Sequence, residues 1–377
     1  MSNPLNILIH APDLQTIGGK QSYFLAVKDA FRHNVTFFTY GKRGRKESKL
    51  YSFWRLFRDY WSFFRTLRKG NFDVVHLNPS LNNNSFFRDI FFMMICRLVG
   101  AKTLVFWHGW NWDFEAKKLP KVMWWFNMTY FKADGMIILA REFEEKLRSY
   151  GVTCPIYLET TVVDDYLVDD VSPPWIEQKF DHMEKVNLLF LARVVEDKGI
   201  FECIDAFARL KPQYPNLVLN ICGTGDAFDA AQALIEELKL EDVHMLGFIN
   251  GPDKTRIFHE STIYLFPSTY GEGLPCSVLE SMGVGLPVIT TDVGGIKDFF
   301  EPENMGAYVH RDAGELVMAL KPLLDSPERI KEIGLYNYHY AKRRFSANQV
   351  ASRIERIYED MHQGQPGQVS AALQPEL

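Results

Sequence analysis

Short apolar runs alternate with longer amphipathic segments along the chain. Six such runs in the first half lie at 6–10, 35–40, 73–77, 102–107, 135–140 and 155–158. The pattern restarts at Val186, with runs at 186–192, 217–221, 243–248, 263–267 and 287–291. Apolar strands separated by helical stretches are typical of a parallel sheet covered on both faces. The pattern therefore predicts an α/β chain with two Rossmann-like halves.

Breaks in this pattern predict the domain boundaries. At 377 residues, the chain exceeds what one hydrophobic core usually supports. We expect an N-terminal domain at 1–163, an interdomain linker at 164–185, where acids and prolines gather, and a second domain at 186–345. A helix at 346–362 either closes the second domain or crosses back to the first, and residues 363–377 are expected to form a flexible tail.

Composition narrows the class of protein. Hydrophobic residues make up 47% of the chain and charged residues 24%, which indicates a globular rather than a disordered protein. The five cysteines are scattered, with no metal-like spacing, which suits a reducing compartment. The first strand follows neither a basic leader region nor a cleavage site, and the apolar run at 90–96 is far shorter than the roughly 20 residues that span a bilayer. We therefore expect a cytoplasmic protein without a membrane-spanning helix.

The most informative stretch is 267–295, which reads PSTYGEGLPCSVLESMGVGLPVITTDVGG. Glu272 falls on a loop, and Glu280 lies inside a short helix that begins near Pro275. Free backbone N–H groups and the positive end of the helix dipole favour an anion at such a helix start. The stretch therefore predicts an anion-binding loop.

This stretch resembles the signature of the retaining nucleotide-sugar glycosyltransferases of family GT4. The resemblance rests on Glu272, seven intervening residues and Glu280, followed by GLPVITT and the pair Gly294-Gly295. It implies the GT-B fold, with two Rossmann-like domains whose parallel sheets face each other across a cleft. It assigns Glu280 to the ribose hydroxyls. It assigns to the donor sugar the acid Glu272 together with Gly273, Leu274, Pro275, Cys276 and Ser277. The alternative is an exposed helical glutamate and an ordinary glycine turn.

Further candidate residues follow other strands. Arg193 comes just after the strand at 186–192, and Lys198 lies five residues later. A guanidinium fork and an ammonium at the carboxyl end of a sheet can both bind one diphosphate, and the pair matches the family pattern. His108, at the end of 102–107, occupies the position of the family's histidine beside the donor sugar. A solvated loop and a hydrogen-bonded structural histidine are the alternatives.

Several glycines and aromatic residues are weaker candidates. The pair Gly18-Gly19 follows the first strand and allows close approach to a diphosphate, although a structural turn explains it equally well. Gly223 opens a tight turn beside the expected nucleotide site. Gly247 and Phe248 lie where relatives hold the base, with a core phenylalanine as the alternative. His76, at the end of 73–77, is either a site residue or a structural histidine.

Two features concern cofactors and the hinge. The triplet Asp-x-Asp, which is the usual metal-diphosphate clamp of the other glycosyltransferase fold, does not occur in the chain. We therefore expect no metal and no other cofactor, with the nucleotide diphosphate sugar as a substrate. The segment 159–164 departs from the Asn-Gly-Val-Asp type of turn that relatives carry, which leaves the hinge contacts to substrate open.

Charge is distributed unevenly. Residues 1–163 carry 23 Lys and Arg against 13 Asp and Glu, a net of +10, whereas residues 164–377 carry 19 against 34, a net of −15. The segment Lys42 to Lys69 holds ten basic and eight aromatic residues. On a helix, the stripe Phe53, Phe57, Tyr60, Phe64 and Leu67 is expected to pack on the sheet. The adjacent stripe is expected to dock on an anionic membrane; it consists of Trp54, Arg58, Trp61, Arg65 and Arg68.

The resemblance to family GT4 implies transfer of a sugar from a UDP- or GDP-linked donor to a hydroxyl of a lipid-linked or cell-surface glycan, in polysaccharide biosynthesis and with retention at the anomeric carbon. The expected partners are the donor, a glycan or glycolipid acceptor and the inner face of the cytoplasmic membrane. A solvated basic helix is the alternative to membrane docking, and nucleic acid is the rival ligand that we do not expect. A nucleotide-sugar epimerase and a non-catalytic membrane-bound nucleotide-binding protein are the alternative functions.

Overall fold

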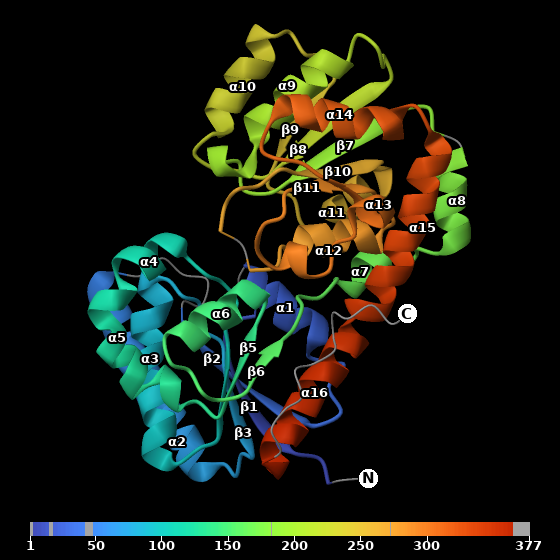
Figure 1. Ribbon diagram of the computed structural model, residues 1–377. Coiled ribbons are helices and arrows are strands. Elements are labelled where there is room, and N and C mark those ends of the chain that lie inside the picture. Colours follow the sequence, from blue (N-terminus) through green and yellow to red (C-terminus); the bar gives the residue numbers. More distant parts are fainter. Residues whose placement is uncertain (1–2, 15–17, 42–47, 182, 272, 365–377) are drawn as a thin grey trace. The chain divides into compact units, whose positions relative to one another are not determined.

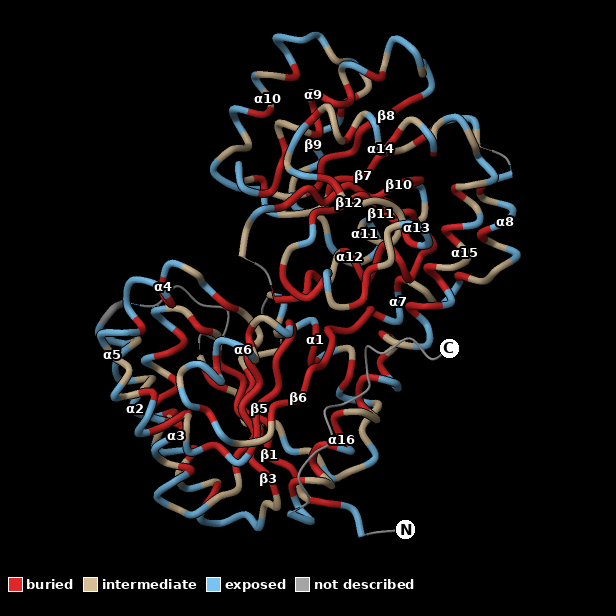
Figure 2. Tube along the Cα trace, viewed as in Figure 1, coloured by how far each residue is buried: buried red, intermediate tan, exposed pale blue. Residues whose placement is uncertain are grey.

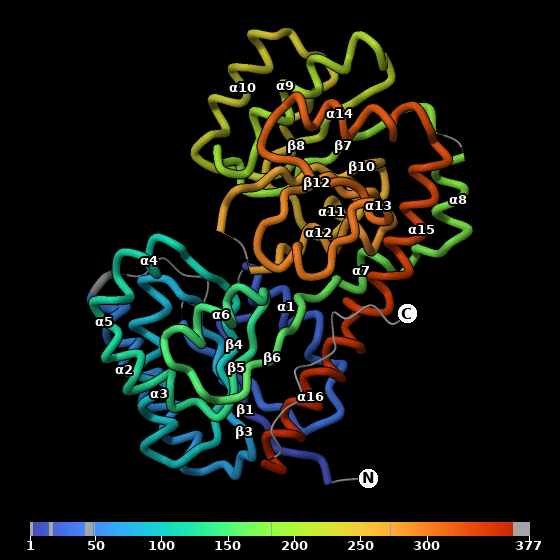
Figure 3. The backbone as a smooth tube through the Cα atoms, viewed as in Figure 1, coloured from blue at the N-terminus to red at the C-terminus, as the bar shows by residue number. Residues whose placement is uncertain are grey.

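The computed structural model describes residues 3–14, 18–41, 48–181, 183–271 and 273–364. Contacts within these residues divide the chain into two units. The first unit contains the described residues up to Val162, then Gly271, Gly273 and Leu274, and the chain from Ala347 onward. The second contains Val163–Tyr270 and Pro275–Ser346. Each unit is built on its own six-stranded sheet, and the path of the chain through both can be followed in Figure 3.

The first sheet is entirely parallel, in the order β2-β1-β3-β4-β5-β6. Its strands coincide with the apolar runs of the sequence, and all of them except the partly exposed edge strand β2 form the buried centre of the unit (Figure 2). The strands are β1 (Asn6–Pro12), β2 (Asn34–Tyr40), β3 (Val74–Leu77), β4 (Thr103–Phe106), β5 (Gly135–Ile138) and β6 (Ile156–Leu158).

Helices cover both faces of this sheet (Figure 1). Parallel crossovers are right-handed, so the connection from β1 to β2 places its helix on one face, and the connections running from β2 towards β6 place theirs on the other. The C-terminal helix packs beside the first helix and against β3. The helices are α1 (Gly19–Val27), α2 (Lys49–Lys69), α3 (Asn83–Val99), α4 (Trp112–Lys117), α5 (Leu119–Met128), η1 (Tyr130–Lys132), α6 (Arg141–Ser149) and α16 (Ala347–Gln363).

The second sheet is also parallel, in the order β12-β11-β10-β7-β8-β9. Its strands again follow the apolar runs, with one short additional strand at the edge. They are β7 (Val186–Leu191), β8 (Leu217–Cys222), β9 (Val243–Gly247), β10 (Ile263–Phe266), β11 (Val288–Thr290) and β12 (Gly306–Tyr308). The predicted α/β class with two parallel-sheet units is confirmed.

The helices of the second unit also form two layers. α9 packs against α14, and α15 packs against α8, α12 and α13 (Figure 1). The bounds are α7 (Asp165–Val168), α8 (Pro173–Asp181), η2 (Glu196–Lys198), α9 (Ile200–Leu210), α10 (Phe228–Glu237), α11 (Gly251–Glu260), α12 (Cys276–Gly283), η3 (Gly294–Asp298), α13 (Pro302–Met305), α14 (Ala313–Leu324) and α15 (Pro327–Arg344).

The expected interdomain linker was wrong, whereas the C-terminal helix takes one of its two expected placements. Residues 164–185, expected as a linker, contain α7 and α8, and α8 buries Ile176 and Phe180. Proline is favoured in the first turn of a helix, so the prolines there begin α8 instead of marking a linker. The C-terminal helix α16 is grouped with the first unit, where Glu355 accepts a 2.9 Å hydrogen bond from the backbone N–H of His33.

The buried face of α2 also differs from the predicted stripe. Asp59, Phe63 and Leu67 are buried, whereas Phe53 and Phe57 are 67% and 62% exposed. The sequence could not separate the two faces because aromatic residues surround most of the helix. The expectation that Phe53 and Phe57 pack on the sheet was wrong.

Candidate functional site

Two neighbouring strands of the second sheet send the chain in opposite directions. β7 continues through α9 to β8, whereas β10 continues through α12 to β11, and the two strands are paired with each other. Open parallel sheets bind ligands outside the carboxyl ends of their strands at such a switch point. The candidate site therefore centres on the loops that follow Leu191 and Phe266.

Two cations from the first of these loops converge on one aromatic ring from the second. The Arg193 guanidinium lies 4.7 Å from the centre of the Tyr270 ring, and Lys198 Nζ lies 4.9 Å from it. The Lys198 ammonium is also 5.0 Å from the Phe266 ring. The structure thus brings the two predicted diphosphate ligands together, and Tyr270 is an addition that the sequence did not indicate.

Arg193 is exposed, but Lys198 is buried. Burial, together with repulsion from Arg193, lowers the pKa of the Lys198 ammonium to about 7. A bound anion would offset both effects, because it favours the charged form of the lysine. The pair is therefore a candidate anion-binding site.

A glycine allows the two loops to meet. Gly199 has a left-handed φ of +78°, and a Cβ there would lie 2.6 Å from the carbonyl oxygen of Pro267. The Thr269 N–H donates a 2.8 Å hydrogen bond to the Asp197 carbonyl beside it. Close packing of the two loops requires a residue without a side chain at position 199.

The predicted ribose ligand Glu280 is buried on α12 and has a partner that the sequence did not indicate. Lys254 Nζ on α11 donates a 2.6 Å hydrogen bond to Glu280 Oε1 and lies 3.9 Å from Asp164 Oδ2. Burial and the nearby Glu280 charge raise the pKa of the Asp164 carboxyl to about 6, and Lys254 opposes this rise. One ammonium is therefore held between two buried carboxylates.

The start of α12 lies beside this cluster. Pro275 occupies the N-cap without a side-chain capping bond, and Cys276 and Ser277 form the first turn. The Ser277 hydroxyl lies 2.7 Å from the hydroxyl of Tyr264, which is also 3.0 Å from the Leu191 carbonyl. This contact ties the helix start to the end of β7 and gives Ser277 a structural role.

Gly223, in the turn after β8, allows backbone to pack against backbone. A Cβ on Gly223 would lie 1.8 Å from the Ala192 carbonyl oxygen, and the Gly223 N–H donates a 2.7 Å hydrogen bond to the Gly247 carbonyl. Phe248 is 54% exposed, which excludes the alternative of a core phenylalanine. Its ring is available for contact with a planar ligand.

The first unit places His108 in a hydrogen-bonded network at the ends of β3 and β4. His108 Nε2 lies 2.8 Å from Asn78 Oδ1, and Asn78 Nδ2 donates a 2.9 Å hydrogen bond to the His10 carbonyl. A carbonyl can only accept, so this bond orients the Asn78 amide, and His108 Nε2 must be the donor. Burial lowers the pKa of His108 well below its usual value, with Lys20 and His76 contributing. The ring is therefore neutral, with Nδ1 as an acceptor.

Lys20 joins this network directly after the glycine pair. Its Nζ donates a 2.6 Å hydrogen bond to the Asn78 carbonyl, and burial lowers its pKa to about 7. Gly18 is the N-cap of α1, and Gly19 is the first residue of that helix. The sequence did not single out Lys20, although its position beside Gly18 and Gly19 was a signal.

His76 has a structural role. Its Nδ1 lies 2.6 Å from the Tyr358 hydroxyl of α16, and the side chain is buried. The structural alternative that the sequence left open is therefore the one observed.

Three predicted residues lie around 272. Glu272 itself is outside the described residues. A Cβ on Gly273 would lie 3.1 Å from Leu139 and 3.4 Å from the His108 carbonyl oxygen, and the Leu274 carbonyl lies 3.4 Å from the Thr161 hydroxyl. Gly273 and Leu274 are thus grouped with the first unit, whereas Arg193, Lys198 and Glu280 belong to the second.

Within the described residues, no group of three or more His, Cys, Asp or Glu side chains is arranged to hold a metal ion. No helix in the described part of the chain is both long and apolar enough to cross a membrane.

Residues 173–340 match the family described as glycosyl transferases group 1. The putative colanic acid biosynthesis glycosyltransferase WcaL of Escherichia coli K12 is 32% identical over 142 residues, which are 36% of this chain and 35% of WcaL. The chain thus spans about a third of that relative's length.

Two solved structures show the same fold over almost the whole chain. The sucrose-phosphate synthase of Thermosynechococcus elongatus superimposes with a TM-score of 0.74 at 17% identity, covering 96% of this chain and 100% of that one. HepE of Anabaena, solved in complex with UDP and glucose, gives a TM-score of 0.71 at 15% identity, covering 94% and 99%.

The two parallel-sheet units and these likenesses define a protein of the GT-B fold class. Within it, residues 173–340 form a domain of the glycosyl transferases group 1, and the resemblance read from residues 267–295 is confirmed.

Proposed function

We propose that the protein is a retaining glycosyltransferase that moves a sugar from a UDP- or GDP-linked donor to an acceptor hydroxyl. The observation that carries the proposal is the convergence of Arg193 and Lys198 on Tyr270 at the switch point of the second sheet. The group 1 domain over this region supports it, as does the likeness to a protein solved with UDP and glucose.

Charge stabilisation would supply most of the catalysis. Breaking the bond between the sugar and the diphosphate leaves negative charge on the departing phosphate oxygen. The Arg193 fork and the Lys198 ammonium would bind that charge, together with the backbone N–H groups at the start of α12. In front-face attack, the departing phosphate also takes the proton of the acceptor hydroxyl, and the configuration of the sugar is retained.

The remaining residues would position the donor. Glu280, held by Lys254, would accept hydrogen bonds from the ribose hydroxyls, and the exposed Phe248 with Gly247 would contact the base. The neutral His108 would accept a hydrogen bond from a hydroxyl of the donor sugar through Nδ1. Glu272 and residues 273–277 are proposed to hold the same sugar.

We propose that this transfer needs no metal, because protein cations bind the diphosphate. The experiment that tests the proposed function is a thermal-shift screen of nucleoside diphosphates and their sugars, followed by a turnover assay with and without a glycan acceptor. Transfer to the acceptor supports the proposal. An isomerised nucleotide sugar formed without any acceptor would indicate an epimerase instead.

We also propose that the protein docks on an anionic membrane, where it would meet a lipid-linked acceptor in polysaccharide biosynthesis. Trp54 and Trp61 on α2 are 63% and 57% exposed. The neighbouring helix α3 exposes a second apolar stripe, and the centre of the Tyr60 ring on α2 lies 5.3 Å from that of the Phe91 ring on α3, with the two rings tilted. The stripe of α3 consists of Phe87, Phe91, Met94 and Leu98.

The charges on these helices match an anionic surface. The acidic residues of α2 and α3 are Asp59 and Asp89, and both are buried and paired, with Arg55 at 3.3 Å and Arg88 at 2.6 Å. The solvent-facing charges of the two helices are therefore basic. Exposed aromatic residues beside arginines favour the lipid headgroup region.

A further inference from the structure

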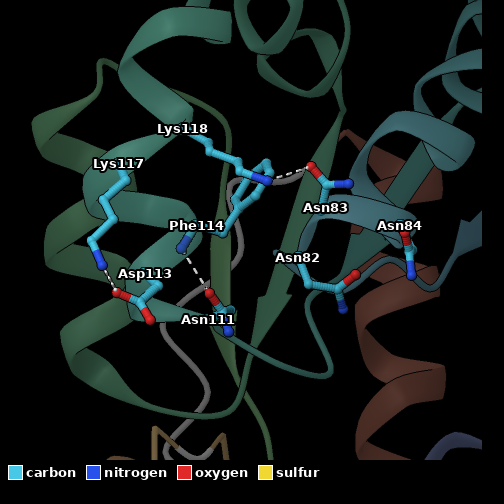
Figure 4. A pocket seen from close by; sticks show the side chains of 8 residues that line it. All are labelled: Asn82, Asn83, Asn84, Asn111, Asp113, Phe114, Lys117 and Lys118. Carbon is cyan, nitrogen blue, oxygen red and sulfur yellow. Dashed lines mark hydrogen bonds and ion pairs between the residues drawn. The ribbon is translucent and has the colours of Figure 1, made fainter.

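A hollow of about 520 Å³ lies in the first unit, away from the residues assigned above. Figure 4 shows its lining, in which four asparagines and two lysines predominate. These are Asn82, Asn83, Asn84, Asn111, Lys117 and Lys118. No motif of the sequence analysis includes this group.

The topology explains why two asparagine-bearing segments meet. One segment follows β3 and begins α3, and the other follows β4 and begins α4. Leu81 forms an isolated parallel bridge with Trp110, with hydrogen bonds of 2.8 Å from Leu81 N to the Gly109 carbonyl and 3.0 Å from Asn111 N to the Leu81 carbonyl. The bridge lies beyond the carboxyl ends of β3 and β4 and brings Asn82 beside Asn111.

The protein itself uses the oxygen atoms of three of these amides. Asn82 Oδ1 accepts from Ser85 N at 3.0 Å, and Asn111 Oδ1 accepts from Phe114 N at 2.7 Å. Asn83 Oδ1 accepts from Lys118 Nζ at 3.0 Å (Figure 4). Each of these three amides keeps an NH₂ group that has no hydrogen-bond partner among the described residues, so the hollow offers amide donors to a ligand.

The charge of the lining has the same preference. Its single carboxylate, Asp113, is paired with Lys117 at 2.6 Å. The Lys118 ammonium contacts the neutral amide oxygen of Asn83 and forms no ion pair within the described residues. A donor-rich hollow with one surplus positive charge suits an anionic, oxygen-rich group such as a phosphate.

The same helix that borders the hollow carries the apolar stripe of the proposed membrane surface. Asn84 lies three residues before Phe87, seven before Phe91 and ten before Met94, a spacing that places them on one face of α3. A phosphate in the hollow could therefore continue into an apolar chain lying along α3. Free phosphate would gain nothing from this stripe.

We infer that the hollow binds the phosphate group of a lipid-linked acceptor, with the attached apolar chain directed along α3. The inference rests on the proposed function for the existence of such an acceptor. It assigns the acceptor's anionic group to Asn82, Asn83, Asn111 and Lys118, at a place distinct from the diphosphate ligands of the second unit.

The test uses the full chain carrying Arg193→Ala and Lys198→Ala, which removes the proposed donor diphosphate contacts. Geranyl diphosphate is titrated by calorimetry into this protein and into the same protein with Lys118→Glu or Asn83→Asp. We expect affinity to fall about tenfold or more in either variant, because each adds negative charge beside the phosphate. Matched controls are Lys121→Glu and Asn127→Asp, exposed positions on α5 that do not line the hollow. Melting temperatures check that all variants fold.

Equal affinity of the hollow variants and the controls would overturn the inference. Inorganic pyrophosphate binding as tightly as geranyl diphosphate would overturn the lipid-linked ligand in favour of free phosphate. The third arm measures binding to phosphatidylglycerol vesicles. An equal reduction of vesicle binding by Lys118→Glu and by the control Lys121→Glu supports the lipid-linked acceptor as the ligand. A loss confined to Lys118→Glu would overturn that identity and assign the hollow to a phospholipid headgroup.

Turnover separates this inference from the proposed function. Sugar transfer without binding of geranyl diphosphate would refute only the acceptor site. Binding of geranyl diphosphate through the hollow without turnover of any nucleotide sugar would refute only the proposed function.

Discussion

The two units of the chain differ in the charge that lies at the carboxyl ends of their strands. The second unit concentrates charge at its switch point, where Arg193 and Lys198 share Tyr270 and Lys254 bridges two buried acids. The corresponding strand ends of the first unit hold a neutral His108 and the Asn78 amide, beside Lys20, whose pKa burial lowers to about 7. Preset charge suits a diphosphate, whereas neutral donors and acceptors suit sugar hydroxyls.

The largest effect is expected where the second unit buries its charges. Lys254→Met would leave Glu280 and Asp164 as two buried carboxylates without their ammonium. Removing one partner of a buried ion pair costs about 3 kcal/mol of unfolding free energy or more, which denaturant titration measures. The control is Lys185→Met on the surface of the same unit. Equal stability of the two variants would show that this ion-pair cluster contributes nothing.

A smaller loss is expected at the diphosphate ligands. Arg193→Ala or Lys198→Ala removes a charge-assisted hydrogen bond worth roughly 1.5 to 3 kcal/mol, so affinity for UDP or GDP should fall about tenfold or more. The melting temperature of the unliganded protein should change little. Unchanged nucleotide affinity by calorimetry would exclude these residues as diphosphate ligands.

Charge reversal on α2 tests the proposed membrane docking of the first unit. Arg58→Glu with Arg65→Glu should abolish co-sedimentation with anionic vesicles at low salt, because each basic residue near such a surface contributes about 1 kcal/mol. Nucleotide binding, which we propose for the second unit, should persist. Arg256→Glu is the control, an exposed arginine of the second unit. Equal binding of the wild type to neutral and anionic vesicles, or none to either, would contradict electrostatic docking.

The pH dependence of donor binding distinguishes the units further. In the unliganded protein, burial lowers the pKa of Lys198 to about 7, and a bound diphosphate would raise it. Binding above pH 7 must then take up a proton, so affinity for a nucleotide sugar should fall by up to about tenfold between pH 7 and pH 8 and stay level below pH 7. Calorimetry with Lys198→Ala should give a flat profile across this range. A wild-type profile that is equally flat would contradict the role of Lys198.

No effect at all is expected from chelation. Turnover should survive EDTA, because the proposed diphosphate ligands are protein cations. Loss of turnover on chelation that Mg²⁺ or Mn²⁺ restores would show that the diphosphate is bound through a metal.

Several parts of the fold could be predicted from sequence for a physical reason. Strands buried on both faces must be apolar throughout, so eleven of the twelve strands of the two sheets appeared as apolar runs. The missed strand β12 has three half-buried residues and therefore carries little apolar signal. The prediction of a linker at 164–185 was wrong because, in sequence, prolines that begin a helix resemble those of a linker.

The candidate site divides along the same line. Arg193 and Lys198 lie five residues apart on one loop, so sequence pattern could pair them. Lys254 and Glu280 lie 26 residues apart on different helices, and no local pattern relates them. The face of α2 that meets the sheet was decided by packing against α3, which placed Phe53 and Phe57 in solvent.

The sequence by itself determined the class of fold, the group 1 domain and the loops that carry the predicted diphosphate ligands, because strand burial and glycine turns leave local patterns. Only the tertiary structure decided which side chains meet across the loops. Tyr270 under the two cations, Lys254 between its acids, Asn78 against His108 and the asparagine hollow all join separate crossovers of a parallel sheet. Such contacts depend on strand order, which brings distant segments together without leaving a periodic signal in the chain.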